Sequence, residues 1–268
     1  MIASFEPISG VKHPALRRAR ALATPAGRAR AQHFLIEGES MLRQALAAKV
    51  GVTDAFLLAD AEVETSLVEA LTQARCYVLP RSLMTKILGT GYDTAITAAA
   101  VVPMRPAPIE ALAAGGGPLL VCERVQDPRN VGVLLRTAEA GGAHGAVLSA
   151  DGADPFSRAA VRSTTGSILR LPFAISRDLA TDLGRLREAG LRIIATSARG
   201  RTPIALAHLD RDCAIIVGNE SEGLSLETRR LADDTVAIPV AGGASSLNVT
   251  VAAGILLHEC LRGAATED

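Results

Sequence analysis

The 268-residue chain is long enough for one large domain or two ordinary ones, and its content of 49% hydrophobic and 21% charged residues is typical of a soluble globular protein. The formal net charge is zero, and the 3% of aromatic residues argue against a surface that stacks many unpaired bases. No apolar run is long enough to span a bilayer, and the N-terminus does not resemble a signal peptide, so we expect a cytoplasmic protein with no membrane partner. The four cysteines form no Cys-x-x-Cys pair, and the histidines do not cluster, so no metal site is predicted.

The segment between Val11 and Gln32 is rich in basic residues and contains no acidic ones. Two interpretations remain open at this point. Charge runs are often solvated surface, but clustered arginines also bind the phosphates of nucleic acids. The candidate RNA-binding residues are Arg17, Arg18, Arg20, Arg28 and Arg30.

Short apolar strands alternate with helical patterns in the first hundred residues. The sequence predicts strands at His33–Ile36, Ala55–Leu58, Cys76–Leu79 and Ala98–Val102, and helices at Glu39–Lys49, Ser66–Ala74 and Ser82–Leu88. These elements predict a small α/β/α domain over residues 1–105. Prolines and three consecutive glycines then disfavour a continuous element, so residues 106–117 are expected to be a linker with at most one short helical turn.

The alternation restarts after the linker and continues to the end of the chain. Strands are predicted at Leu119–Cys122, Ala146–Ser149, Arg192–Thr196, Ala214–Val217 and Thr235–Ile238. Helices are predicted at Asn130–Ala140, around Ser157–Arg162, and at Leu179–Glu188, Leu226–Leu231 and Leu247–Leu261. Continuous apolar strands separated by helices predict an α/β domain over residues 118–268, with a parallel sheet covered on both faces.

Polar and glycine-rich segments follow three of these strands, where open parallel sheets bind ligands. They are ERVQDPRNVGVLLRTAEAGG after Cys122, GNESEGL after Val217, and IPVAGGASSLNVTV from Ile238 onward. Taken singly, Asn130, Ser246 and Asn248 are typical helix caps. A nucleotide-binding glycine fingerprint directly after the first strand is absent, so spacing alone indicates a ligand site and names no reaction.

Together these segments strongly resemble the SpoU (TrmH) family of ribose 2′-O-methyltransferases, within the SPOUT superfamily. The first resembles the motif N-x-G-x-x-x-R-T-A-x-A-x-G, from Asn130 to Gly142. The second resembles G-x-E-x-x-G-L, from Gly218 to Leu224, and the third I-P-x-x-G-x-x-x-S-L-N-V-[ST]-V-A, from Ile238 to Ala252. The N-terminal segment FLIEGESMLRQAL resembles, less sharply, the substrate-binding domain of the family, which is related to an RNA-binding ribosomal protein.

The resemblance implies a SPOUT fold with a deep trefoil knot in the C-terminal domain, S-adenosylmethionine as the methyl donor, and a homodimer that completes each site. It implies that loops after three strands hold the donor through Thr196, Ser197, Gly218, Asn219, Gly223, Ile238 and Leu247. It implies a catalytic set of Asn130, Arg136, Glu220, Ser246 and Asn248. Arg136 matches the central residue of that set, and a guanidinium holds its proton too firmly to act as a simple base.

The expected activity is methyl transfer to a ribose 2′-hydroxyl of structured RNA, with 23S rRNA favoured over tRNA and no DNA partner. A tRNA ribose methyltransferase remains the first alternative. A non-catalytic RNA-binding or assembly protein that kept the fold is the second.

Overall fold

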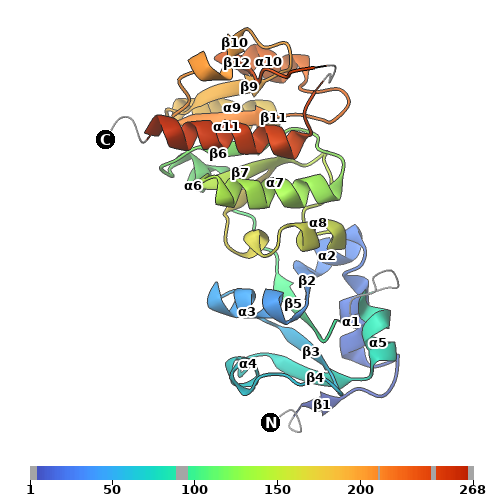
Figure 1. Cartoon of the computed structure of the whole chain (residues 1–268). Helices are drawn as coiled ribbons and strands as arrows, with labels where there is room; N and C mark the ends of the chain where they lie inside the picture. The colour runs from blue at the N-terminus through green and yellow to red at the C-terminus, as the bar shows by residue number, and fades with distance from the viewer. Residues whose placement is uncertain (1–4, 89–95, 211, 243–245, 265–268) are drawn as a thin grey trace. The chain divides into compact units, whose positions relative to one another are not determined.

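The computed structural model describes residues 5–88, 96–210, 212–242 and 246–264. The chain forms two compact units (Figure 1). The first contains the chain up to Arg105 together with Phe156–Leu169, and the second contains Pro106–Pro155 and the chain from Arg170 onward.

A five-stranded mixed sheet in the order β1-β4-β3-β5-β2 organises the first unit. β5 runs antiparallel to β2 and to β3, whereas β4 is parallel to β3 and to β1. The strands are β1 (Glu6–Pro7), β2 (His33–Glu37), β3 (Asp54–Leu58), β4 (Arg75–Leu79) and β5 (Ala98–Pro103). The helices are α1 (Pro14–Ala21), α2 (Pro25–Ala31), α3 (Glu39–Ala47), α4 (Thr65–Ala70), α5 (Arg81–Leu88) and α8 (Arg158–Ser163), with a 3₁₀ turn η2 (Ser167–Leu169).

The basic N-terminal segment forms α1 and α2, which the sequence did not predict. The ring Nδ1 of His13 accepts a hydrogen bond from the first turn of α1, and the hydroxyl of Thr24 accepts one from the first turn of α2. Proline occupies the first position of each helix, where its missing N–H costs nothing. Leu16 and its alanine neighbours on α1 lie in the core of the unit, so the segment is part of the folded domain.

Residues 156–169 follow the first strands of the second unit in sequence, yet they pack on β2 of the first. The rings of Phe156 and Phe34 lie 5.1 Å apart between centroids. Arg158 and Arg162 both pair with Glu37, whose side chain is only 4% exposed, and Arg162 Nη1 lies 2.9 Å from Glu37 Oε2. Two cations therefore neutralise one buried carboxylate.

The second unit contains a seven-stranded parallel sheet in the order β10-β12-β9-β11-β6-β7-β8. Its strands are β6 (Leu119–Cys122), β7 (Gly145–Ser149), β8 (Phe173–Ser176), β9 (Arg192–Thr196), β10 (Thr202–Pro203), β11 (Cys213–Val217) and β12 (Asp234–Ala237). Its helices are α6 (Ile109–Ala113), α7 (Pro128–Ala140), α9 (Leu179–Glu188), α10 (Leu226–Leu231) and α11 (Val249–Ala264), with a 3₁₀ turn η3 (Ile204–Leu206). The predicted parallel α/β sheet is confirmed.

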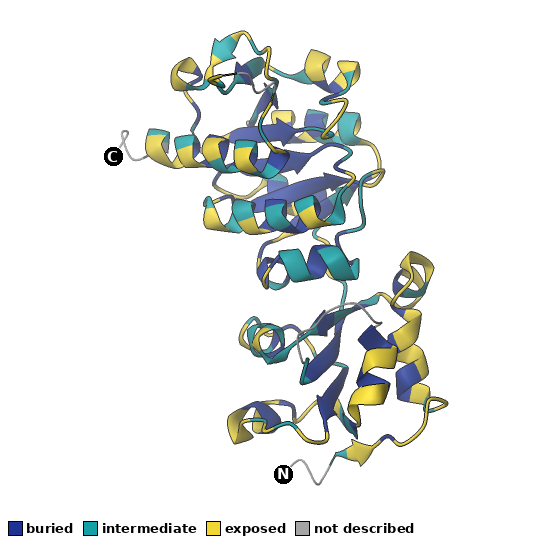
Figure 2. Ribbon diagram, turned by 45° about the vertical axis from the view of Figure 1, so that its right-hand side comes forward, coloured by how far each residue is buried: buried dark blue, intermediate teal, exposed yellow. Residues whose placement is uncertain are grey.

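Helices cover both faces of this sheet. α7 and α11 pack side by side on one face, while α9 contacts α6 and α10 on the other (Figure 1). β6, β7 and β11 are consequently buried along their whole length, as the dark blue strands of Figure 2 show. Gly141 allows the close approach of α7 and α11, because a Cβ there would lie 2.8 Å from Cβ of Leu257.

Strand β11 lies between β9 and β6, both of which precede it in the chain. β12 then adds beyond β9. Insertion of a late strand between two earlier ones is the arrangement that threading of the C-terminal chain would produce. The trefoil knot itself remains a prediction.

Candidate active site

A cleft of about 1220 Å³ lies at the carboxyl ends of β9, β11 and β12. Its wall is formed by residues in the segments 196–201, 217–224 and 238–252, which follow these strands, and by residues of α10 and β12 between 229 and 236. Positions 243–245 of the third segment lie outside the described residues. All of the residues predicted to bind the donor line this cleft, namely Thr196, Ser197, Gly218, Asn219, Gly223, Ile238 and Leu247.

The loop after β11 folds back on itself, and two glycines make this possible. A Cβ on Gly218 would lie 2.6 Å from the backbone carbon of Gly223, and Gly223 itself has a positive φ of 68°. L-residues with a side chain rarely adopt that conformation. The glycines are thus required by the loop's own geometry, in addition to any approach of a ligand.

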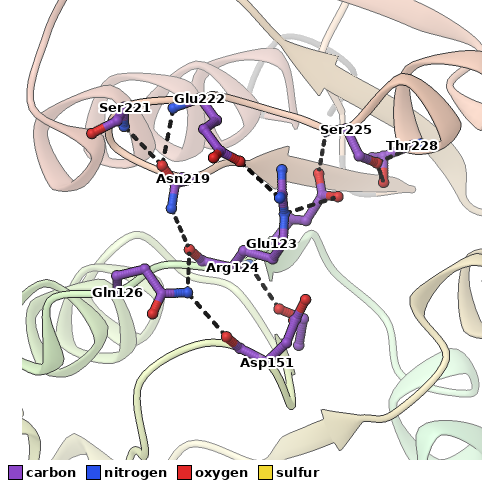
Figure 3. Close-up of polar contacts among 10 residues, drawn as sticks. Glu123, Arg124, Gln126, Asp151, Asn219, Ser221, Glu222, Ser225 and Thr228 are labelled. Carbon is purple, nitrogen blue, oxygen red and sulfur yellow. Dashed lines mark hydrogen bonds and ion pairs between the residues drawn. The ribbon is translucent and has the colours of Figure 1, made fainter.

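Asn219 fastens this loop to the segment that follows β6. Its side-chain oxygen accepts hydrogen bonds from the N–H groups of Ser221 and Glu222, at 2.9 and 3.0 Å, and its amide donates to the carbonyl of Arg124 at 2.9 Å (Figure 3). These bonds use both ends of the Asn219 amide. Its role in the structure is therefore to hold two loops together at the edge of the cleft.

Glu220 connects the second motif to the first. Its carboxylate accepts hydrogen bonds from Asn130 Nδ2 at 2.8 Å and from the backbone N–H groups of Gln126 and Asp127 at 3.2 and 3.4 Å. Burial alone would raise the pKa of Glu220, but the bonds from Asn130 and the backbone outweigh it, and the pKa lies below its ordinary value. The carboxylate is ionised at neutral pH and already accepts hydrogen bonds from three N–H groups.

The start of α7 differs from the prediction that Asn130 opens this helix. Asp127 is the cap, with Oδ1 accepting a hydrogen bond from the N–H of Arg129 at 2.8 Å, and Pro128 is the first helical residue. Because the Asp-Pro pair provides both a capping acceptor and a preset φ, the helix begins two residues earlier. Asn130 is therefore free of capping and donates to Glu220 instead.

Arg136 lies on the exposed side of α7 and is not part of the cleft wall. Within the described residues it makes no hydrogen bond or ion pair. Apolar residues around it, such as Leu135 and Ala138, are buried on the other side of the helix, so the side chain of Arg136 is available to a ligand or to another chain. Among the other catalytic candidates, Glu220, Ser246 and Asn248 line the cleft.

The third motif begins α11. Asn248 Oδ1 accepts hydrogen bonds from the backbone N–H and the hydroxyl of Thr250, at 2.8 and 2.7 Å. This is the bond pattern of a helix cap, so Asn248 caps α11 and also lies in the cleft wall. Ser246 is exposed at the same edge.

Sequence reasoning missed the residues directly after β6 that support the cleft. Buried Glu123 accepts a hydrogen bond from the N–H of Ser225 at 3.0 Å, and Arg124 pairs with Glu222 at 2.9 Å (Figure 3). Arg124 has a φ of 51°, a left-handed conformation held by a 2.7 Å bond from its N–H to the hydroxyl of Ser149. Their only signal in the sequence is the cluster of polar residues after an apolar strand.

The candidate RNA-binding arginines fall into two groups. Arg17, Arg20 and Arg30 are exposed, without a partner in the part of the chain that the structure describes. Arg18 is exposed and donates to Asp54 Oδ1 at 3.2 Å. Arg28 is buried and donates to the carbonyl of Leu22 at 2.8 Å, so it serves the N-terminal fold and is not available to RNA in this structure.

Across the described ranges, no three His, Cys, Asp or Glu side chains are grouped so that they could hold a metal ion. No helix among the same residues has the length and apolar character needed to cross a membrane.

The sequence profile described as the SpoU rRNA Methylase family matches residues 117–258, which is more than half of the chain. The chain belongs to the SpoU rRNA methylase family. The resemblance inferred from the three motifs is confirmed. A second profile, described as the N terminus of thiostrepton-resistance methylase, matches residues 5–114.

Similar SpoU family proteins extend over nearly the whole chain. The 23S rRNA (guanosine(2553)-2′-O)-methyltransferase RlmP of Bacillus subtilis strain 168 is 33% identical over 260 residues, which cover 97% of this chain and 100% of the relative. The AdoMet-bound rRNA methyltransferase from Sinorhizobium meliloti aligns with a TM-score of 0.85 and 25% identity, covering 96% of this chain and 98% of the other. The SpoU methyltransferase AviRb from Streptomyces viridochromogenes, in complex with AdoMet, aligns with a TM-score of 0.81 and 27% identity, covering 93% and 98%.

Proposed function

We propose that this chain transfers the methyl group of S-adenosylmethionine to a ribose 2′-hydroxyl of 23S rRNA, in the cytoplasm and as a homodimer. The observation that carries the proposal is the convergence of all the predicted donor-binding residues on one cleft. The names of the relatives support the reaction, since one methylates 23S rRNA and two solved structures contain AdoMet.

The chemistry of the cleft fits this donor. Ile238 and Leu247 provide apolar side chains that can flank the adenine, while the backbone of the loops at Thr196 and Gly218 provides polar groups for the ribose and the amino-acid tail. When bound, the donor supplies a methyl group that its sulfonium has already activated. The chain itself must then align the 2′-hydroxyl, and alignment can lower the barrier by several kcal/mol.

Each catalytic candidate has a distinct role in this proposal. A guanidinium is a poor base, so we assign Arg136 to bind the phosphate beside the target ribose and to stabilise the developing oxyanion. Glu220 and Asn130 position the loop after β11 against α7, which carries Arg136. Ser246 orients the ribose from the cleft edge, and Asn248 fixes the start of α11.

The position of Arg136 favours a site completed by a second copy of the chain. Arg136 lies outside the cleft wall of its own chain, and the adjacent helix α11 exposes Val251 and Ile255, at 49% and 38%, one turn apart. Exposed apolar residues on a packed helix pair are typical of an interface. We infer a C2 dimer through α7 and α11 that brings Arg136 to the partner's cleft.

The proposed RNA-recognition domain spans residues 1–105, followed by a linker over 106–117 and the methyltransferase domain over 118–268. Arg17, Arg20 and Arg30 provide exposed positive charge, and Arg18 adds a guanidinium shared with Asp54. Arg28 is left out of this set because it is buried.

Tritiated methyl transfer from S-adenosylmethionine to separate pools of unmodified rRNA and tRNA tests the proposal. We expect label in one position of the large-subunit rRNA, at an alkali-resistant linkage that marks a 2′-O-methyl group. Label confined to tRNA would keep the chemistry and change the substrate. Absence of both label and donor binding would leave a non-catalytic RNA-binding protein as the better interpretation.

A further inference from the structure

Three arginines line the donor cleft. Arg199 and Arg201 belong to the loop after β9, and Arg229 lies on α10. All three are exposed, and their guanidinium groups make no hydrogen bond or ion pair within the residues that the structure describes. None belongs to the three family motifs, and none is used by the proposed mechanism.

The acidic residues of the same wall are already occupied. Each of the four has a partner other than these arginines: Glu220 with Asn130, Glu222 with Arg124, Asp233 with Arg187, and Asp234 with Thr202. The negative charges of the wall are therefore balanced or hydrogen-bonded, whereas its three positive charges face the cleft without compensation. This edge of the cleft is suited to an anion.

The loop that carries two of the arginines is closely fixed to the sheet. Gly200 lies between Arg199 and Arg201, and a Cβ on it would lie 2.6 Å from the backbone carbon of Val236 in β12. The N–H of Gly200 donates to the carbonyl of Ser197 at 3.0 Å, and the N–H of Arg199 donates to the Ser197 hydroxyl at 3.2 Å. The two side chains therefore start from a backbone position that is set before any ligand binds.

The charge of the methyl donor indicates which anion is bound. S-adenosylmethionine carries a sulfonium, an ammonium and a carboxylate, so its net charge is positive. Three unpaired guanidinium groups beside it would repel the donor as a whole, although one could bind its carboxylate. A phosphodiester backbone, with one negative charge per nucleotide, fits a group of three arginines better.

We propose that Arg199, Arg201 and Arg229 form a phosphate-binding rim that holds the RNA backbone at the mouth of the donor cleft. This proposal rests on the proposed function and adds a third RNA contact, separate from the N-terminal domain and from Arg136. The rim places the phosphates of the substrate strand beside the donor, and so determines how the target ribose enters.

The test compares the wild type with the R199Q/R201Q/R229Q triple variant. The matched control is R230Q, because Arg230 is the next residue on α10, is exposed, and is not part of the cleft wall. Binding of unmodified 23S rRNA transcript is measured by filter retention at several salt concentrations, and donor binding is measured by calorimetry without RNA. For the triple variant we expect RNA affinity to fall about tenfold or more at low salt and the slope of log affinity against log salt to decrease by about two. Donor affinity of the triple variant should stay the same or rise, because the loss of positive charge removes repulsion of the donor, and both affinities of R230Q should stay within about twofold of the wild type.

Unchanged RNA affinity and salt slope in the triple variant would overturn the rim. Weaker donor binding with unchanged RNA binding would also overturn it, and would assign the arginines to the donor's carboxylate. These outcomes are distinct from failure of the proposed function, in which the wild type itself transfers no methyl group to rRNA.

Discussion

At the residue scale, Glu220 joins the loop after β11 to the start of α7 through its bonds to Asn130 and the backbone. Its folded pKa lies below its ordinary value, because these bonds outweigh the opposing effect of burial. The stabilisation is therefore complete above the ordinary pKa of a glutamate and is lost as the pH falls through the lower, folded value.

Glu220→Gln tests this connection. Glutamine has one acceptor oxygen and turns an NH₂ group toward the N–H groups that the carboxylate binds. A charge-assisted hydrogen bond contributes about 1.5–3 kcal/mol, less some loss to solvent screening. We therefore expect the affinity for S-adenosylmethionine at pH 7 to fall about tenfold. Calorimetric titration at several pH values should also show a weaker decline of affinity upon acidification than in the wild type. Glu222→Gln is the control, since its exposed pair with Arg124 should contribute little. An equal loss in both variants would contradict a specific role for Glu220.

Gly218→Ala should disrupt the same loop by a different route. The new Cβ would lie 2.6 and 2.7 Å from backbone atoms of Gly223 and Leu224, which cannot move without opening the loop. We expect donor binding to fall at least about tenfold, because the loop would have to open to relieve a backbone clash of the kind that costs about 1–3 kcal/mol. Gly184→Ala is the matched control: Gly184 lies within α9, the added Cβ would meet no atom within 4 Å beyond the neighbouring backbone of its own helix, and alanine there should stabilise the helix by up to about 1 kcal/mol. Wild-type donor affinity in Gly218→Ala would show that the loop tolerates opening.

At the element scale, α11 carries the surface on which the proposed dimer depends. Ile255→Glu places a carboxylate in the centre of that surface, and its burial without a partner should raise the dimer dissociation constant by about 100-fold or more. Sedimentation velocity measures the oligomeric state, and methyl transfer should fall with the loss of the dimer. Leu226→Glu is the control, because Leu226 is 65% exposed on α10, away from α11. A dimeric and active Ile255→Glu variant would rule out this interface.

Elements with long apolar patterns were predicted closely from the sequence. The predicted limits of β6, β9, α9 and α10 agree with the structure to the residue. β6 and β9 are mainly apolar strands, and α9 has leucines at helical spacing. α1 and α2 were missed because their buried faces consist of a few residues among arginines. β8 has only three apolar residues, between Pro172 and Ser176, and β10 has two residues in all, so neither shows a pattern.

The site was predictable in its residues but not in its contacts. The motifs identified which side chains gather at the carboxyl edge of the sheet. The bond between Asn130 and Glu220 joins residues 90 positions apart, and only the fold brings them together. The burial of Arg28 likewise depends on the turn at Leu22, so its charge alone indicated a surface role that the structure does not support.

At the scale of the whole molecule, the first unit includes a segment from the second half of the sequence. Glu37 is buried against Arg158 and Arg162 of that segment. Glu37→Gln leaves two arginines without their carboxylate. Breaking a fully buried pair costs about 3–5 kcal/mol, but these arginines are 31% and 33% exposed, so we expect the free energy of unfolding to fall by about 2 kcal/mol. Differential scanning calorimetry should show a lower transition temperature for the first unit, while the affinity of the second unit for S-adenosylmethionine stays unchanged. Glu64→Gln removes only an exposed ion pair with Arg43 and should change neither the transition temperature nor this affinity. Equal transitions in all three proteins would mean that the segment is not needed by the first unit.

The position of β11 also has a consequence for how the chain folds. β6, β7 and β8 can pair as they are synthesised, but β9 has no neighbour on the β6 side until residues 213–217 arrive. Its other neighbour, β12, follows β11 in the chain, so β9 has no partner strand until β11 is made, and the sheet becomes continuous only when β11 enters between β6 and β9. Such a non-local step is slow. We therefore expect the entry of β11 to limit the rate at which the second unit refolds. A ligand that orders the loop after β11 would then act late in folding, by stabilising a sheet that is already continuous.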